Sequence, residues 1–283
     1  MNALGLRNVL LCVDVSYQCY RAAAAHPMLT SRRVFTGGLY GFMTTLAKTI
    51  RETQATHVVF CRDVKPYLRS LEYPEYKQLR VAKRDDELLK MYQQTMSLVL
   101  DVLMDLGFDP WGIEGFESDD LIGHSAIKYR NRFEMIYAAS NDSDLFQLLY
   151  IDNFAIYSKS IADVTTGLTL MRDTGLTPDQ FSHMTAITGT HNDIAGIKGV
   201  GPVTAKKALH DPSVMRTLRD QHGKVIDRNR GLIKLPHAQL PTDIQLPLFR
   251  GSFDRRQLYR SLGFYDIDVT TSMVNAFEQV TRK

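Results

Sequence analysis

Acidic side chains cluster between Gly115 and Gly123, just ahead of an apolar run with helical spacing. Glu117, Asp119 and Asp120 all lie in this short stretch. Such acids commonly cap a helix, because carboxylates accept hydrogen bonds from its first N–H groups and suit the positive end of its dipole. A metal site is the alternative, since hard divalent cations prefer oxygen ligands. Taken alone, the stretch favours the helix cap, which is the commoner of the two.

Four further aspartates shift the balance towards a metal site. Each follows a short apolar run that is typical of a buried strand: Asp14, Asp63, Asp142 and Asp144. In a parallel sheet the carboxyl ends of the strands meet at one edge, where ligands bind. Carboxylates gathered there would repel one another unless cations lay among them. The pattern therefore predicts one acidic, metal-binding cluster.

The elements that must position these acids alternate between strands and helices. Strands are expected at 8–15, 57–61, 135–139 and 154–157, and helices at 39–50 and 85–106. This alternation predicts an α/β fold, with a mostly parallel central sheet flanked by helices and right-handed crossovers. A stretch at 64–84 mixes aromatic and basic residues without a clear period.

After Leu176 the strand pattern stops, and the remaining chain is expected to be helical. The segment from Ile197 to Lys207 is typical of a helix-hairpin-helix, because Gly199 and Gly201 permit a tight turn with outward-facing N–H groups. Pro202 suits the first turn of the next helix, whose N-terminus can hold a phosphate. An ordinary glycine-rich connection between helices is the alternative.

Composition describes an ordinary globular protein of 283 residues, with 44% hydrophobic and 23% charged residues. The chain has no apolar run of membrane-spanning length and no signal-peptide pattern at its start. Its three cysteines follow neither a disulfide nor a zinc-site spacing. We therefore expect a cytoplasmic protein that does not interact with membranes.

Charge is distributed unevenly along the chain, although the net charge is only +3. Residues 101–152 carry eleven acids and three bases, whereas 198–234 carry nine bases and three acids. An acidic centre between basic segments suits an enzyme that grips a polyanion and cuts it at bound metal. Simple solvation of charged faces is the alternative.

The order of the short motifs carries a family resemblance. They are Val13-Asp14, Tyr20-Arg21, Gly38-Leu39-Tyr40-Gly41-Phe42, Pro74-Glu75-Tyr76-Lys77, Glu117-Ser118-Asp119-Asp120, Asn141-Asp142-Ser143-Asp144 and the hairpin. From about residue 9 to 209, the chain resembles the 5′-nuclease family of flap endonucleases and 5′–3′ exonucleases. It is most similar to stand-alone phage exonucleases and to the N-terminal nuclease domain of bacterial DNA polymerase I.

The resemblance implies two Mg²⁺ sites, which Mn²⁺ can also fill. Ligands of the first ion would be Asp14, Asp63, Glu117 and Asp119. Ligands directed towards the second would be Asp120, Asp142 and Asp144, with help from Asp193. The family's hairpin also often holds K⁺ on backbone carbonyls, here expected from Ile187, Thr188, Ala195, Ile197 and Val200.

The resemblance also implies how DNA is handled. Lys77 and Arg80 would be the catalytic basic residues at the base of a helical arch, at about 64–95, through which a single-stranded 5′ end passes. The residues expected to contact DNA are Arg21, Tyr76, Lys77, Arg80, Gly199, Gly201, Thr204, Lys206 and Lys207. We expect a nuclease core at 1–175, and a helical C-terminal region at 176–283 with the hairpin at about 194–209.

One departure from the family pattern concerns the second metal site. The family usually has Gly-Asp-x-x-Asp-Asn-Ile before the hairpin, whereas this chain has Gly189-Thr190-His191-Asn192-Asp193-Ile194. The segment is one residue shorter, and Thr190 replaces the first aspartate. The second ion is therefore expected to bind weakly.

The function implied by the resemblance is that of a metal-dependent 5′–3′ exonuclease or flap endonuclease, which hydrolyses DNA phosphodiesters in replication or repair. Its substrates would be 5′ ends, flaps or RNA–DNA primer junctions, in a bacterium or a phage-infected cell. A monomer is expected, with a single-strand-binding protein or a polymerase as candidate partners. The alternatives are a catalytically weak flap- or primer-binding protein, which Thr190 favours, and a metal-dependent ribonuclease on a related sheet, which would not need the hairpin.

Overall fold

A central β-sheet organises the computed structural model, which describes residues 8–78, 85–190 and 194–282. The strand order in this sheet is β4-β1-β5-β6-β7. Its strands are β1 (Val9–Asp14), β4 (His57–Cys61), β5 (Met135–Ala139), β6 (Phe154–Tyr157) and β7 (Val164–Thr165). The first four pair in parallel, and only the two-residue β7 runs antiparallel, against β6. The predicted mostly parallel α/β fold is confirmed, with all four predicted strands in place.

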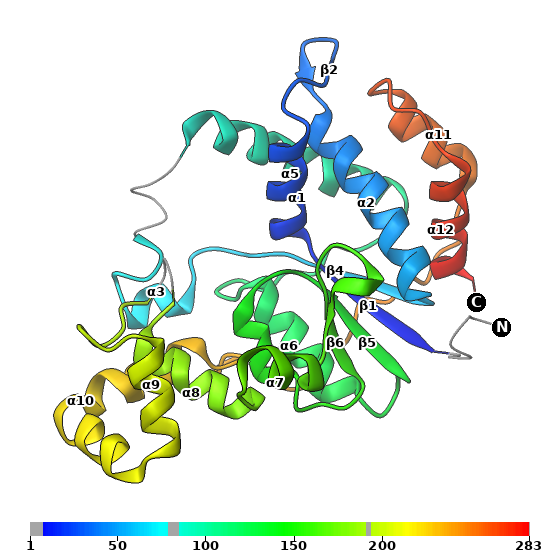
Figure 1. Ribbon diagram of the computed structural model, residues 1–283. Coiled ribbons are helices and arrows are strands. Elements are labelled where there is room, and N and C mark those ends of the chain that lie inside the picture. The colour runs from blue at the N-terminus through cyan, green and yellow to red at the C-terminus, as the bar shows by residue number, and fades with distance from the viewer. Residues whose placement is uncertain (1–7, 79–84, 191–193, 283) are drawn as a thin grey trace.

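Strand β1 lies in the middle of the parallel part, and its register places the carboxyl ends of three strands together. Asp14 is paired with Cys61 of β4, and Val13 is paired with Ala139 of β5. The residues that follow these three strands therefore emerge side by side at one edge of the sheet, as Figure 1 shows for β1, β4 and β5. That edge is where the predicted acids belong.

Side chains of β1 alternate between the two faces of the sheet, as expected for a strand with period two. Val9, Leu11 and Val13 pack with one cluster, and Leu10 and Cys12 pack with the other. The helices on the first face are α1 (Val15–Ala25), α2 (Gly37–Thr53), α5 (Asp86–Asp105), α11 (Arg255–Gly263) and α12 (Thr271–Thr281). The elements on the second face are α6 (Ser118–Tyr129), the 3₁₀ helix η1 (Ser143–Leu148) and α7 (Gly167–Thr174).

Helices α2 and α5 approach each other closely at Gly38. A Cβ atom there would lie 1.8 Å from the Thr95 side-chain oxygen. Any larger residue would push the two helices apart, which gives a packing reason for one glycine of the motif at 38–42. Since α1 packs against both helices, this contact also supports the helix that Asp14 caps.

A separate lobe carries its own apolar cluster, which includes Ala186, Ile197 and Leu218. Its helices are α8 (Pro178–Thr188), α9 (Pro202–His210) and α10 (Pro212–Ile233), the last with a kink at His222. Figure 1 shows this lobe below the short helix α3 (Leu68–Glu72), and Tyr76 from the same basic stretch is buried in its cluster. None of the described helices, those of the lobe included, is long and apolar enough to cross a membrane.

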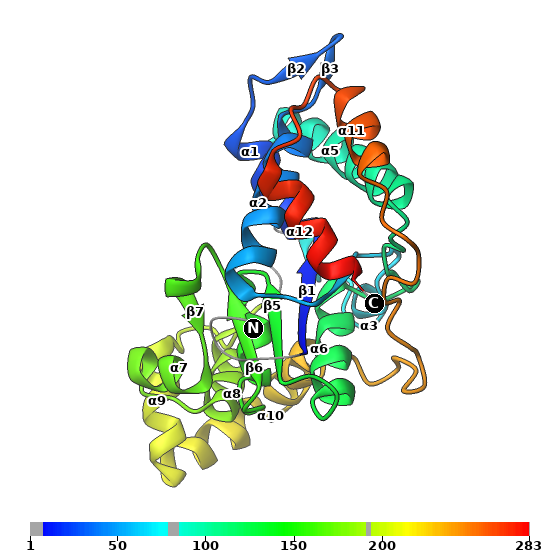
Figure 2. The same cartoon turned by 90° about the vertical axis from the view of Figure 1, so that its right-hand side faces the viewer.

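The end of the chain differs from the predicted helical region at 176–283. Only the part up to Ile233 belongs to the lobe, because Leu240 and Leu246 pack beside the sheet with α6. Helices α11 and α12 then join the opposite face, where Figure 2 shows α12 lying along α2. Burial of their apolar residues against the core is the physical reason. The short elements that were not predicted include the hairpin strands β2 (Thr30–Ser31) and β3 (Val34–Phe35), the 3₁₀ helix η2 (Ile161–Asp163), and β7 and α3.

Candidate metal centre

Four aspartates from separate segments meet at the carboxyl edge of the sheet. Asp14 ends β1 and caps α1, accepting a hydrogen bond from the Tyr17 N–H at 3.0 Å. Asp63 lies just beyond β4 and accepts from the N–H of Ser118, the first residue of α6, at 2.8 Å. Asp142 caps η1, and Asp119 lies in the first turn of α6. Helix caps and strand ends therefore bring together acids that are far apart in the sequence.

Asp14 is buried among hydrogen-bond donors but still resists ionisation. Its side chain accepts from Ser118 Oγ and Ser140 Oγ, each at 3.0 Å. Burial, followed by the charge of Asp63, raises the pKa of Asp14 from 3.8 to about 7, even though these donors lower it. A carboxylate in this position is destabilised by its neighbours unless a cation lies nearby.

Asp119 shows the need for a cation most directly. Its Oδ1 atom is buried and accepts no hydrogen bond from any described residue. Burial, followed by the charges of Asp142, Asp14, Glu117 and Asp63, raises the pKa of Asp119 well above its usual value. A buried acceptor without a donor is uncommon in proteins and points to a missing ion or water. A divalent cation would satisfy this oxygen and relieve the repulsion.

The acids are close enough to act on one another's pKa, but they do not surround one point. No group of three or more His, Cys, Asp or Glu side chains within 8–78, 85–190 and 194–282 could hold a metal ion as the side chains lie here. Mutual repulsion keeps uncompensated carboxylates apart. The residues still fit a divalent cation, because all the donors are oxygens and the Oδ1 atom of Asp119 lacks a partner. The predicted ligand sets remain a prediction.

Glu117, the residue before α6, is surrounded by positive and polar groups. Its Oε2 atom accepts from Arg69 Nη1 at 3.1 Å and from the Tyr76 hydroxyl at 2.8 Å. Its Oε1 atom forms an ion pair with Lys77. Burial alone would raise the pKa of Glu117, but the charges of Lys77 and Arg69 lower it below its usual value. Glu117 is thus held as a carboxylate without a metal ion.

Asp120 is placed differently from its predicted role as a ligand of the second metal. Its side chain is inaccessible to solvent, and both oxygens face Arg69, at 2.6 and 2.7 Å. The N–H groups of Glu117 and His237 also donate to them, at 3.1 and 2.8 Å. These four hydrogen bonds use the acceptor sites that a carboxylate offers. The contacts make Asp120 a structural residue and leave no oxygen for a metal.

The basic stretch at the base of the predicted arch lies beside the acids. Lys77 has a left-handed backbone, with φ of 60°, and contacts Glu117. Tyr76 was expected to contact DNA, but its ring is buried in the lobe and its hydroxyl binds Glu117. Arg80, predicted to be catalytic, and Asp193, predicted to be a metal ligand, lie outside the described residues.

The glycine-rich turn before α9 lies where the sequence predicts a helix-hairpin-helix. Gly199 has a φ of 82°, a left-handed conformation that favours glycine, and Gly201 caps α9. Thr204 and Lys207 are exposed on the first turns of α9. Lys206, also expected to contact DNA, is only half-exposed and donates to the Thr174 carbonyl at 2.7 Å. Lys207 is therefore the better placed of the two lysines.

Carbonyls of the predicted K⁺ site already take part in hydrogen bonds. Ile187 O accepts from the Ile197 N–H, Ile197 O accepts from the Val200 N–H, and Ala195 O accepts from Asn229 Nδ2. A carbonyl oxygen has two lone pairs, so these bonds do not exclude an ion. The K⁺ site, including its Thr188 carbonyl, remains a prediction.

Thr190, which replaces an aspartate of the family pattern, forms two hydrogen bonds with Ile194. Its N–H donates to the Ile194 carbonyl, and its Oγ1 accepts from the Ile194 N–H, both at 3.0 Å. The hydroxyl therefore satisfies the backbone of the shortened segment. This local role explains why a threonine suits the shortened loop.

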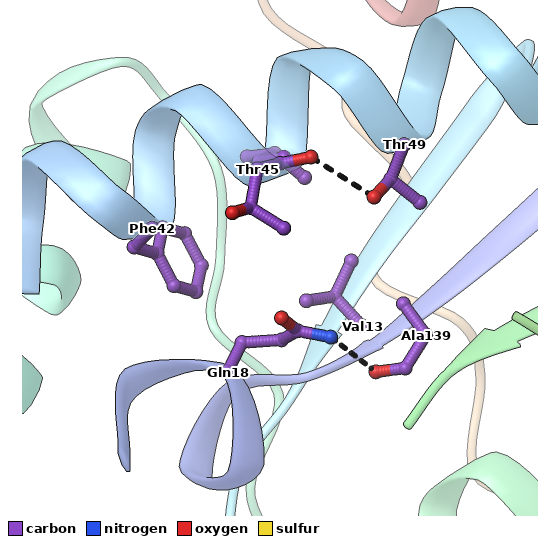
Figure 3. Close-up of a pocket in the computed structure, with 7 residues that line it drawn as sticks. Val13, Gln18, Phe42, Thr45, Thr49 and Ala139 are labelled. Atoms are coloured by element: carbon purple, nitrogen blue, oxygen red, sulfur yellow. Dashed lines mark hydrogen bonds between the residues drawn. The ribbon is translucent and has the colours of Figure 1, made fainter. Parts of the chain in front are cut away.

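Several supporting residues were not predicted from the sequence. Gln18 of α1 donates to the Ala139 carbonyl at 3.0 Å, which fastens α1 to the end of β5 beside a cavity of about 10 Å³ (Figure 3). Arg21, expected to contact DNA, donates to the Ser158 carbonyl at 3.0 Å from the same helix. Arg69 and Ser118 bind the acids directly. These contacts join residues that are distant in the sequence, so no local pattern could indicate them.

Comparison with known proteins places this arrangement among nucleases. The model of the 5′-3′ exonuclease N-terminal resolvase-like domain matches residues 9–175. A 5′-3′ exonuclease of Bacillus subtilis is 32% identical over 259 residues, which cover 83% of this chain and 85% of that protein. DNA polymerase I of Mycobacterium tuberculosis is 29% identical over 270 residues, 87% of this chain. The chain spans only 29% of the length of that polymerase.

Solved structures show the same fold. The bacteriophage T5 flap endonuclease, in a pseudo-enzyme-product complex with DNA and metal ions, has a TM-score of 0.68 at 16% identity, covering 97% of this chain and all of that one. Flap endonuclease-1 from Methanococcus jannaschii has a TM-score of 0.59 at 14% identity, covering 96% of this chain and 92% of that one.

Proposed function

We propose a function on the premise that this chain belongs to the 5′-3′ exonuclease family, whose model matches more than half of its length. The chain hydrolyses phosphodiester bonds of DNA at 5′ ends and at flaps, in a reaction that depends on Mg²⁺. The Bacillus subtilis relative is named a 5′-3′ exonuclease, and the T5 neighbour is named a flap endonuclease. Cleavage of flap, gapped and RNA–DNA primer substrates separates flap cleavage, exonuclease activity and primer removal.

One observation carries the proposal: the buried and unpaired Oδ1 atom of Asp119 at the carboxyl edge of the sheet. The carboxylates of Asp14, Asp63, Glu117 and Asp142 all act on the pKa of this residue. A protein without a cation in this place would gain stability by losing one of these charges. Such an arrangement suits a metal-binding function better than a purely structural one.

The residues proposed to hold the first ion are Asp14, Asp63, Glu117 and Asp119, with Asp142 and Asp144 directed towards a second. When bound, Mg²⁺ would supply the Lewis acidity that activates water and neutralises the charge of the leaving oxygen. Asp120 is not part of either set, because Arg69 and two backbone N–H groups occupy its oxygens. The second set is therefore poor in carboxylates, and we expect it to fill mainly when DNA phosphate supplies further oxygens.

Lys77 is proposed to stabilise the phosphate in the transition state. In the DNA-free protein its ammonium group forms an ion pair with Glu117. A phosphate that entered the site beside Glu117 would offer a second anion within reach of the same side chain. Positive charge placed where negative charge develops lowers the barrier of the reaction. Arg80 is proposed for the same role from the sequence alone.

The lobe is proposed to hold the duplex behind the cleavage point. The turn at Gly199 and Gly201 exposes the N-terminus of α9, which can bind a phosphate group. Lys207 is exposed in the same helix and adds positive charge. The family resemblance adds three further expectations to this proposal. They are a K⁺ ion at the hairpin, a polymerase or a single-strand-binding protein as partner, and action as a monomer in the cytoplasm.

A cleavage assay on three labelled DNA substrates tests the proposal: a 5′ flap, a gapped duplex and a single strand. Products from the flap or the gapped duplex in Mg²⁺, abolished by EDTA, are expected. An RNA–DNA primer junction in the same assay measures primer removal. Asp63→Ala is the matched control that is expected to be inactive, since Asp63 is a proposed ligand of the first ion and is only partly buried. Tight binding of the flap without any cleavage, in Mg²⁺ or Mn²⁺, would support a flap-binding protein instead.

A further inference from the structure

Arg69 of α3 is the most highly connected side chain at the site, and neither composition nor motif singles it out. It is only 3% exposed. Its Nη1 atom donates to Glu117 Oε2 and Asp120 Oδ2, and its Nη2 atom donates to Asp120 Oδ1. Nη2 also donates to the Lys234 carbonyl at 3.1 Å, and Nε donates to the Leu232 carbonyl at 2.7 Å. All five N–H groups of the guanidinium are therefore used.

These contacts join three segments that the sequence separates widely. Arg69 belongs to the base of the predicted arch, Glu117 precedes α6, and Leu232 lies at the end of α10 in the lobe. The same end of α10 is anchored to the hairpin, because Asn229 donates to the Ala195 carbonyl at 3.0 Å. Glu117 is thus fastened, through one arginine, to the lobe that carries the hairpin.

The two carboxylate oxygens of Glu117 have different partners, which indicates which oxygen faces the metal site. Oε2 is held by Arg69 and by the hydroxyl of the buried Tyr76. Oε1 contacts Lys77, whose side chain is about one quarter exposed at 23%. The buried pair of donors holds one oxygen, and the other faces the more accessible side. A metal ligand needs this kind of support, because outer-shell hydrogen bonds orient carboxylates towards the ion.

We propose that Arg69 is a positioning residue, which holds Glu117 Oε2 so that Oε1 is presented to the metal ion. The inference deepens the proposed function and rests on it. Arg69 contacts neither the substrate nor the reacting atoms in this account. Asp120 completes the arrangement, because its two oxygens fix the plane of the guanidinium. A lysine could not replace this arginine, since it has a single ammonium group and no planar fork.

The test measures Mn²⁺ binding to the DNA-free protein, by calorimetry and by the electron paramagnetic resonance signal of free Mn²⁺. Arg69→Lys keeps the charge but loses the fork, and metal affinity is expected to fall by about 10-fold or more. Arg228→Lys is the matched control. Arg228 lies near the end of α10 that Arg69 contacts and donates to the Ala195 carbonyl and to Asn229, and no described acid of the site accepts a hydrogen bond from it. This control is expected to keep the wild-type affinity.

A second variant separates loss of metal binding from loss of folding. Removing Arg69 alone leaves the buried Asp120 without its partner, which is strongly destabilising. The paired change Arg69→Met with Asp120→Asn removes both charges together and still takes the support from Glu117. The pair is expected to unfold near the wild-type urea concentration and to bind Mn²⁺ about as weakly as Arg69→Lys.

A double-mutant comparison shows whether Arg69 acts through Glu117. In a Glu117→Gln background, Arg69→Lys is expected to cause no further loss of Mn²⁺ affinity, because the two residues form one unit. Wild-type Mn²⁺ affinity in both Arg69 variants, or additive losses in the double variant, would overturn the positioning role alone. A wild-type protein that binds no Mn²⁺ would overturn the proposed function and this inference together.

Discussion

Replacing Asp14 with asparagine isolates the charge of this residue from its hydrogen bonds. Asparagine is as good a helix cap as aspartate, so the bond from the Tyr17 N–H is kept. Its amide NH₂ can donate to the Ser140 hydroxyl, which is able to accept as well as donate. Asp14→Asn therefore removes mainly one negative charge from the cluster.

The expected gain in stability follows from the pKa of Asp14. Burial and the charge of Asp63 raise this pKa from 3.8 to about 7 in the folded, metal-free protein. At about 1.4 kcal/mol per pKa unit, ionisation of Asp14 costs the folded state at most about 4 kcal/mol. Because the pKa of Asp14 is higher in the folded than in the unfolded protein, the folded protein binds more protons than the unfolded protein at pH values between these two pKa values. Wild-type stability therefore falls as pH rises from 3.8 through 7.

Urea denaturation in EDTA, repeated over a pH series, measures this effect. The Asp14→Asn variant lacks the titrating group, so it is expected to match the wild type near pH 4. Its free energy of unfolding is expected to exceed the wild-type value by up to about 4 kcal/mol above pH 7. Mg²⁺ is expected to narrow this difference in stability. At one hundred times its dissociation constant it adds about 2.7 kcal/mol to the wild type, and less to the variant.

Asp152→Asn is the control, since it removes an exposed aspartate away from the cluster. It is expected to leave the pH dependence of stability unchanged. An Asp14→Asn variant that is less stable than the wild type at every pH would refute the reasoning. So would a stability difference that does not grow between pH 4 and 7, because repulsion at Asp14 would then be absent.

Four further outcomes are expected. Lys77→Ala is expected to lower turnover far more than DNA affinity, whereas Lys207→Ala is expected to weaken DNA binding and to reduce the slope of log affinity against log salt concentration by about one unit. Single-turnover rates measure the first effect, and anisotropy titrations measure the second. If both variants lost only DNA binding, and to the same extent, Lys77 would be a DNA contact without a role in the transition state. Asp63→Ala abolishes cleavage with an unchanged circular dichroism spectrum, and near-normal turnover at saturating Mg²⁺ would remove Asp63 from the ligand set. Calorimetric titration of the DNA-free protein detects one tight ion and one weak ion, while two equally tight sites would show that Thr190 costs no metal affinity. Asn229→Ala removes a donor from the Ala186 carbonyl and one of two donors from the Ala195 carbonyl. It is expected to lower the free energy of unfolding by about 1–3 kcal/mol, which an unchanged urea midpoint would contradict.

Helices and strands were predicted well where burial is periodic along the chain. Residues 57–61 and 135–139 form β4 and β5 as expected, and the predicted helix at 85–106 is α5. These segments bury one stripe or a whole strand against the core, so their apolar residues repeat with the period of the element. The same reasoning predicted that the aspartates lie at the carboxyl ends of β1, β4 and β5, since parallel strands place these ends together.

The sequence did not distinguish neighbouring residues of one type that have different surroundings in the structure. Asp119 and Asp120 are neighbours, yet one has an unpaired buried oxygen and the other is saturated by Arg69 and backbone N–H groups. Lys206 and Lys207 differ in the same way, because only Lys206 reaches the Thr174 carbonyl. Adjacent positions on a helix point about 100° apart. Their surroundings are therefore set by different distant segments.

Local patterns in the chain were sufficient for the order of strands and helices, for the edge at which the acids gather, and for the glycine-rich turn at Gly199. Each of these depends on the spacing of residue types within one segment, where the backbone repeat dictates what faces the core. Only the tertiary structure decided that Asp120 is structural, that residues 234–282 return to the sheet, and that Arg69 holds Glu117 to the end of α10. Hydrogen bonds and burial between segments far apart in the chain determine these features, and such contacts leave no periodic trace in the sequence.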